Sequence, residues 1–482
     1  MTKGTIINGF IWRFLERCGA QGVTLIVSIV LARLLNPDLY GTISLIMVFI
    51  TIMEVFVDSG FGNALIQKKD ADETDFSSVF YFNLFFGITL YLLMFLIAPA
   101  IANFYSNSAF TAYIRVLSIV VVIASVKNIQ IAYVSRNMLF KKFFFATIIG
   151  TVISGFIGIL MAYYGFGVWA IIVQNLSNTF LDTCILWITV KWRPTKKFCY
   201  NRFIKLYAFA WKLLVTSLID TAYQKIRQLI IGKIYSTSDL AYYNQGQQLP
   251  YAIISNLNAS IDSVLLPSIS SAQDNVSKVK NMTRQSISLG VYIISPLLLG
   301  LFAVSETLVS VLLTDKWLPC VFYLRVACAS YVFTPINTAN LNAIKALGRS
   351  DIVLKLEIYK KIIGCSILLF TVFLSVRWIA IGLLISAVIS QIINSLPNKK
   401  LMNYGYFEQI KDIIPQIGIS VLMGAIVYCV QFIGLNDILT LSIQIPVGAI
   451  IYIVLSKVFH IDSFEYLVYT VKGLFHKQKK EA

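Results

Sequence analysis

The sequence predicts an all-α polytopic membrane protein. Of its 482 residues, 57% are hydrophobic and only 13% are charged, which is about half the charged share of a typical soluble domain. About fourteen apolar segments are long enough to cross a bilayer as helices, which takes about 20 residues each. Polar residues gather in short connections between these segments. This composition excludes an ordinary soluble enzyme.

Each predicted span is expected to be a helix, because a helix satisfies its backbone hydrogen bonds within the hydrocarbon. The first span begins with Arg13, Glu16 and Arg17, is too long for a signal peptide and is followed by further spans. We therefore expect it to be retained. In chain order the expected spans are residues 11–33, 40–60, 78–100, 112–134, 143–164, 167–189, 204–233, 240–270, 284–304, 318–344, 352–375, 378–398, 411–433 and 438–459.

The basic residues predict the orientation. They cluster in every second connection, for example at residues 68–69, 191–205 and 399–411, whereas the alternate connections hold few. Because Lys and Arg are enriched on the cytoplasmic side of membrane proteins, this alternation predicts that both termini are cytoplasmic. The same alternation explains the net charge of +17 by a location in the cytoplasmic membrane, so no nucleic acid partner is expected.

Three weak internal matches indicate a repeat. Residues 12–15 resemble residues 211–214, residues 38–40 resemble residues 239–242, and residues 164–170 resemble residues 377–382. Chance similarity between apolar helices is the alternative. The repeat predicts two six-helix halves of the same orientation, with substrate between them, as in many transporters. The expected division is 1–200 for helices 1 to 6, 201–403 for helices 7 to 12, 404–460 for helices 13 and 14, and 461–482 for a cytoplasmic, amphipathic, basic tail. A plain solvated tail is the alternative for the last segment.

Common catalytic motifs are missing from the sequence. The seven cysteines show no paired spacing, the two histidines lie near the C-terminus, and no phosphate-binding loop occurs. Connections on the outward side are too short for a catalytic domain. We therefore expect no enzyme activity, no metal and no cofactor other than a coupled proton or sodium ion.

Four predicted spans carry polar stripes. A charged residue at mid-bilayer costs about 2.5 to 3.5 kcal/mol and usually faces protein or water. Helical spacing puts each of four sets on one face of its helix. The sets are Arg13, Arg17, Gln21, Thr24 and Ser28 in the first span, Met47, Thr51, Glu54 and Asp58 in the second, Lys212, Thr216, Asp220, Tyr223 and Arg227 in the seventh, and Asn244, Gln248, Tyr251, Ser255, Asn258 and Asp262 in the eighth.

Two interpretations of these stripes remain. The charges either satisfy one another in a packed bundle or line a hydrated cavity, and four stripes on repeat-related helices favour the cavity. Its cations suit an anionic ligand, because arginine binds phosphate through two hydrogen bonds. Its acids are either counter-ions or binders of a coupling proton or sodium ion. Lys127 and Arg325 are minor candidates.

Several stretches resemble a known family. Residues 12–17, 27–41, 57–70, 167–170 and 316–319, with 346–349, are similar to the Wzx-type polysaccharide flippases, in the lipopolysaccharide and colanic acid exporter branch. The resemblance implies the multidrug/oligosaccharidyl-lipid/polysaccharide superfamily and its MATE-like fold, two six-helix lobes in a V around a central cavity with two further helices. It also implies a substrate, a polyprenyl-diphosphate-linked oligosaccharide repeat unit.

The resulting hypothesis is an alternating-access flippase for surface polysaccharide biosynthesis, driven by a proton or sodium gradient. Its expected partners are the lipid-linked oligosaccharide, membrane lipids, a polysaccharide polymerase and chain-length machinery. A membrane-embedded polymerase or glycosyltransferase and a cation-coupled drug efflux antiporter are the alternatives. The expected diphosphate site is Arg13, Arg17, Lys212 and Arg227; the sugar site is Gln21, Tyr223, Asn244, Gln248, Tyr251, Ser255 and Asn258; and the ion-coupling or counter-ion residues are Glu54, Asp58, Asp220 and Asp262.

Overall fold

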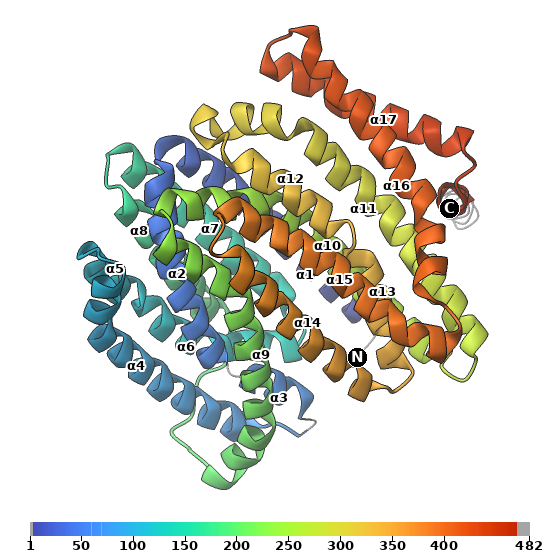
Figure 1. The fold of residues 1–482 in the computed structure, drawn as a ribbon. Helices are drawn as coiled ribbons and strands as arrows, with labels where there is room; N and C mark the ends of the chain where they lie inside the picture. Colours follow the sequence, from blue (N-terminus) through green and yellow to red (C-terminus); the bar gives the residue numbers. More distant parts are fainter. Residues whose placement is uncertain (1–2, 59, 69, 470–482) are drawn as a thin grey trace. The chain divides into compact units, whose positions relative to one another are not determined.

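The computed structural model describes residues 3–58, 60–68 and 70–469 (Figure 1). Within these residues the chain forms seventeen α-helices and two short 3-10 turns, and no strand is found there. Side chains are described for all of these residues except 3–11, 14, 17, 209, 259–260, 262–264 and 267. The all-α prediction is confirmed for the described part of the chain.

The chain divides into two compact units, Met1–Ala241 and Tyr242–Ala482. The helix α9 belongs to the first unit because it packs on α2 and α3. The predicted division after residue 200 was based on the sequence repeat, and it stays a prediction. The first unit holds α1 (Lys3–Leu34), α2 (Pro37–Asp58), α3 (Phe61–Gln67), α4 (Glu73–Phe104), α5 (Ala109–Leu117), α6 (Ile119–Arg136), α7 (Phe140–Tyr163), α8 (Val168–Thr189), α9 (Tyr200–Ile234) and the start of α10 (Thr237–Ser270). The second holds the rest of α10, α11 (Val276–Leu313), η1 (Asp315–Trp317), α12 (Cys320–Tyr331), α13 (Thr334–Ala346), α14 (Ser350–Thr371), α15 (Val376–Met402), α16 (Tyr406–Cys429), η2 (Val430–Ile433) and α17 (Asp437–Val458).

Nine helical stretches in the described residues are long and apolar enough to cross a membrane. They include α2 with α3, α4, α5 with α6, α7, α8, α11, α15, α16 with η2, and α17. The other predicted spans coincide with α1, α9, α10 and α14, which carry charges or amides, and with the interrupted pair α12 and α13. The protein is a multi-pass membrane protein, and the total of about fourteen spans remains a prediction.

Two predicted spans are each broken into a pair of helices. The fourth breaks at Ser118, whose hydroxyl bonds back to the Ile114 carbonyl, and the tenth breaks before Pro335. The turns that follow these pairs also match: the Leu139 amide bonds the Val134 carbonyl, and the Arg349 amide bonds the Ile344 carbonyl. These matching breaks and turns support the internal repeat.

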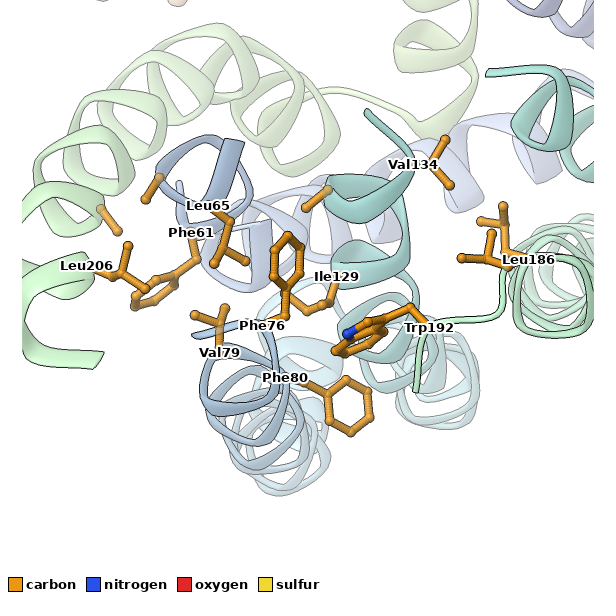
Figure 2. Packing of buried hydrophobic residues seen from close by; sticks show 14 of the residues in the cluster. Phe61, Leu65, Phe76, Val79, Phe80, Ile129, Val134, Leu186, Trp192 and Leu206 are labelled. Atoms are coloured by element: carbon orange, nitrogen blue, oxygen red, sulfur yellow. The ribbon is translucent and has the colours of Figure 1, made fainter. Parts of the chain in front are cut away.

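An aromatic core fastens the start of α9 to the first unit. Phe61 of α3 stacks on Phe203 of α9, with ring centroids 5.4 Å apart. Figure 2 shows that Phe76 of α4 and Trp192, from the segment after α8, lie in the same cluster. The connection between α8 and α9 is therefore held by packing at residues 61–76.

Hydroxyl groups tie α16 and α17 to α11 in the second unit. Ser295 lies 2.8 Å from Ser420 of α16, and Tyr292 donates to Ser456 of α17 at 3.0 Å. Of the predicted amphipathic tail, residues 462–469 are helical and Ile461 is buried against the same core. The remainder of that tail, residues 470–482, lies outside the described residues.

A buried amide network joins α13, α15 and α16. The Oδ1 atom of Asn340 accepts from the side chains of Gln409, at 3.0 Å, and Asn398, at 2.6 Å. The Asn340 amide donates back to the Oε1 atom of Gln409 at 2.8 Å. All three residues are fully buried, so each bond replaces contact with water.

The Gln409→Ala variant is expected to destabilise the second unit by about 1–3 kcal/mol, because it leaves the Asn340 amide buried and unpaired. The measurement is the thermal unfolding midpoint of the purified protein in detergent. The matched control is Lys411→Ala, which removes an exposed side chain from the same helix. Equal midpoints for the two variants would contradict a stabilising role for the network.

Candidate functional site

The polar stripe of α1 is partly satisfied by its own neighbours. Arg13 donates to Glu16 at 2.9 Å, and its guanidinium lies 4.9 Å from the ring centroid of Phe143 in α7. Gln21 is exposed, whereas the side chain of Arg17 lies outside the described residues. For Arg13 the structure therefore gives the packed, charge-paired arrangement that was the alternative interpretation.

The two acids of α2 differ in their surroundings. Glu54 is partly buried and has Lys127 of α6 and Asp58 as electrostatic neighbours. Asp58, one turn further on, is exposed. The structure thus relates Glu54 to a lysine that sequence reasoning had ranked as a minor candidate.

The stripe of α9 runs from exposed to buried along the helix. Lys212 is exposed, Asp220 and Tyr223 are half-buried, and Arg227 is only 8% exposed. The guanidinium carbon of Arg227 lies 5.2 Å from the centroid of the Tyr223 ring. This is a cation–π contact, which gains strength as the cation loses water. The pair Arg227 and Tyr223 is the best-defined part of the predicted diphosphate and sugar sites.

The amide-rich stripe of α10 lies in the second unit. Asn244, Gln248, Ser255 and Asn258 are all half-buried. The Oδ1 atom of Asn258 is buried and has no hydrogen-bond partner among the described residues. Tyr251 is 58% exposed, with its ring 6.4 Å from that of Tyr331, and the side chain of Asp262 lies outside the described residues.

Other intramembrane charges have close partners. Arg325 donates to the Ser305 hydroxyl at 2.8 Å and lies 3.4 Å from the Glu306 carboxylate. Lys360 and Glu357 form a 2.6 Å pair on α14. These contacts agree with a structural role for Arg325 and for the pair of Lys360 and Glu357.

Sequence reasoning missed the polar face of α8. Gln174, Asn178 and Asp182 recur every four residues and so share one side of the helix. Asp182 lies 3.7 Å from Lys127 of α6. Two features of the sequence could have revealed this face. One is the four-residue spacing, and the other is that α8 is the least apolar of the nine stretches long enough to cross a membrane.

A polar cavity of about 560 Å³ lies in the first unit beside the start of α9. Its lining includes Lys68, Asp72, Arg202 and Lys205. Asp72 caps α4 through the amides of Thr74 and Asp75 and is ion-paired with Arg202. That guanidinium holds the pKa of the Asp72 carboxyl below its usual range. Sequence reasoning had placed these residues in connections without proposing a site.

Over the described ranges, no group of three or more His, Cys, Asp or Glu side chains is placed to hold a metal ion.

Comparison with known proteins identifies the family. The model of a family described as polysaccharide biosynthesis protein matches residues 30–322, which is more than half of the chain. The chain belongs to this polysaccharide biosynthesis family.

Curated relatives of about the same length as this chain share 20–23% of its residues over the matched regions. The teichuronic acid biosynthesis protein TuaB of Bacillus subtilis is 23% identical, over 83% of this chain and 85% of TuaB. The lipopolysaccharide biosynthesis protein WzxC of Escherichia coli is 22% identical, over 85% and 81%. The succinoglycan biosynthesis transport protein ExoT of Rhizobium meliloti is 20% identical, over 65% and 63%.

Solved structures show the fold. The lipid II flippase MurJ, in an inward closed conformation, matches 95% of this chain and 99% of its own, with a TM-score of 0.73 and 16% identity. An inward-facing MATE multidrug resistance transporter of the MOP superfamily matches 79% and 94%, with a TM-score of 0.62 and 15% identity. These two likenesses show the fold, and the predicted MATE-like fold class is confirmed.

Proposed function

We propose that this family member is a flippase for surface polysaccharide biosynthesis. It moves a polyprenyl-diphosphate-linked oligosaccharide repeat unit from the inner to the outer leaflet of the cytoplasmic membrane by alternating access. The observation that carries the proposal is the fold, which this chain shares nearly end to end with a lipid II flippase. In this chain, long apolar helices also present polar faces. Relatives named for teichuronic acid, lipopolysaccharide and succinoglycan biosynthesis support a saccharide cargo.

The residues of α9 and α10 supply the chemistry that such a cargo needs. A diphosphate presents oxygens that a guanidinium binds through two hydrogen bonds, and Arg227 is the buried guanidinium of the α9 stripe. Lys212, on the same face, is exposed and adds a second positive charge. The half-buried amides of α10 offer donors and acceptors for sugar hydroxyls.

The same proposal includes a location, an energy source and partners. The alternation of basic residues supports cytoplasmic termini. Transport is coupled to a proton or sodium gradient and involves no chemical conversion of the cargo. A polysaccharide polymerase and chain-length machinery then receive the flipped unit.

One observation favours a second candidate function. The MATE likeness is compatible with efflux of cationic drugs. Such cargo favours a cavity dominated by acids, whereas the stripe of α9 holds one acid, Asp220, and two cations, Lys212 and Arg227. Drug resistance conferred by expression of the protein would support efflux over the saccharide cargo.

The test is a leaflet assay after deletion of the gene. Intact spheroplasts are treated with a membrane-impermeant sugar label, and a second sample is broken open before labelling. We expect the lipid-linked unit to accumulate and to be labelled only in broken spheroplasts, because translocation is the missing step. Complementation with the wild-type gene is the control. Accumulation of label-accessible units in intact spheroplasts would contradict a flippase and favour a polymerase or a later export step.

A further inference from the structure

The polar face of α8 packs directly on α7. A side chain added at Gly150 would collide with the Asp182 carboxylate, and one at Gly158 would come 2.7 Å from the Gln174 Cβ atom. The two antiparallel contacts fix one register, in which Ser154 lies opposite Asn178. Glycine and serine on α7 therefore leave the room that the polar side chains of α8 occupy.

Asp182 is buried and only partly satisfied. The residue is 7% exposed, and its Oδ2 atom lies 3.7 Å from the Lys127 ammonium, beyond normal hydrogen-bond distance. Its Oδ1 atom is buried and finds no hydrogen-bond partner among the described residues. An ionised carboxylate in this state is costly, so the site favours a ligand that neutralises the carboxylate.

The surrounding charges leave one negative charge in excess. Lys127 has both Asp182 and Glu54 as electrostatic neighbours, so one lysine serves two carboxylates. Glu16, the other charged neighbour of Asp182, is paired with Arg13. On the remaining helices that pack against α8, Arg115 of α5 lies over the Phe95 ring, and Lys142 of α7 donates to the Thr189 carbonyl. Neither of these two cations compensates Asp182.

We propose that Asp182 binds the coupling proton and that Lys127 alternates between Asp182 and Glu54. A proton from water adds to the Asp182 carboxylate and forms a neutral carboxyl group, while Lys127 stays an ammonium and pairs with Glu54. Release of that proton restores the Lys127 pair with Asp182. The ammonium within 4 Å of the carboxylate disfavours a second, larger cation such as sodium. This inference rests on the proposed transport function, for which it names the ion and its site.

Infrared spectroscopy tests proton binding without any cargo. The full-length protein in lipid nanodiscs is measured as a function of pH, and the signal is the carbonyl stretch of a protonated carboxyl group. We expect the wild-type spectrum to include a titrating band from a buried carboxyl group, and we expect this band to be lost in Asp182→Asn. The matched control is Asp274→Asn, which alters an exposed acid in the loop after α10 and is expected to keep the band. An unchanged band in Asp182→Asn would overturn the proposal.

Two further arms test the lysine and the ion. In Lys127→Gln the Asp182 carboxyl is expected to stay protonated to a pH about 1–3 units higher, because the stabilising positive charge is gone. A titration identical to the wild type would overturn the role of Lys127. Replacing potassium by sodium at fixed pH is expected to leave the band unchanged, and a sodium-dependent loss of the band in the wild type would show a sodium site instead.

A transport arm separates this inference from the proposed function. In proteoliposomes supplied with a polyprenyl-diphosphate-linked oligosaccharide, an imposed pH gradient is expected to accelerate flipping by the wild type and to have no effect on Asp182→Asn. If the wild type does not flip this lipid but the Asp182 band titrates, the proposed function fails and the proton site stands. If the wild type flips it and Asp182→Asn responds equally to the gradient, the proton site fails and the flippase stands.

Discussion

The Arg227→Gln variant is expected to lose export of the lipid-linked repeat unit. Arg227 is only 8% exposed and lies over the Tyr223 ring, so its guanidinium is held in a partly dehydrated position on the polar face of α9. Loss of a buried charge that pairs with a ligand costs about 2–5 kcal/mol, which is about 30-fold or more in binding. Export is measured by the leaflet assay at matched membrane levels of the protein.

Three companion variants sharpen this test. Arg227→Lys keeps the charge but loses the planar fork and is expected to export partially. Tyr223→Leu removes the ring that packs on the guanidinium. It is expected to weaken binding of the cargo by about 0.5–2 kcal/mol and to reduce export accordingly. Arg349→Gln is the control, because Arg349 is exposed and paired with Asp351 two residues away. If Arg227→Gln exports normally at a normal protein level, Arg227 does not bind the cargo and its charge has only a structural role.

The Gly41→Ala variant is expected to reduce the amount of folded protein sharply. A methyl group at Gly41 of α2 would overlap the backbone carbonyl of Thr237 at the start of α10. Because the opposing atoms belong to the backbone, a rotamer change cannot relieve the overlap. Overpacking of this kind costs about 1–3 kcal/mol, occasionally more. The measurements are the thermal unfolding midpoint in detergent and the yield of monodisperse protein.

The chain supplies a matched control for this substitution. Gly22 lies within α1, and an added methyl group there meets nothing within 4 Å. Gly22→Ala is therefore expected to be neutral or slightly stabilising, because alanine favours a helix over glycine by about 1 kcal/mol. If Gly41→Ala unfolds at the same temperature as Gly22→Ala, the close approach of α2 to Thr237 does not limit stability.

The helical architecture was largely predictable from apolar runs and their punctuation. The expected span 143–164 is close to α7, at Phe140–Tyr163, and the span 438–459 nearly coincides with α17, at Asp437–Val458. Such limits follow from local chemistry, since a lipid-embedded backbone must form its own hydrogen bonds. The breaks at Ser118 and before Pro335 were not expected, because an apolar run continues through each of them.

The candidate site was predictable only in part. Periodicity correctly placed Tyr223 and Arg227 on one face of α9, one turn apart, and the structure adds that they stack. It overlooked Asp182, because a single acid in α8 forms no charged stripe. It also ranked Lys127 low, since this lysine shares no stripe with another charge in its own helix.

The sequence by itself determined the fold class, the helices and the face on which each polar residue lies, because these depend on hydrophobicity and on the 3.6-residue period of one helix. Only the tertiary structure decided the partners of those residues. Lys127 of α6 lies 3.7 Å from Asp182 of α8, and Gly150 of α7 makes room for that carboxylate. Partners on different helices depend on packing and register between segments far apart in the chain, which the period of a single helix does not encode.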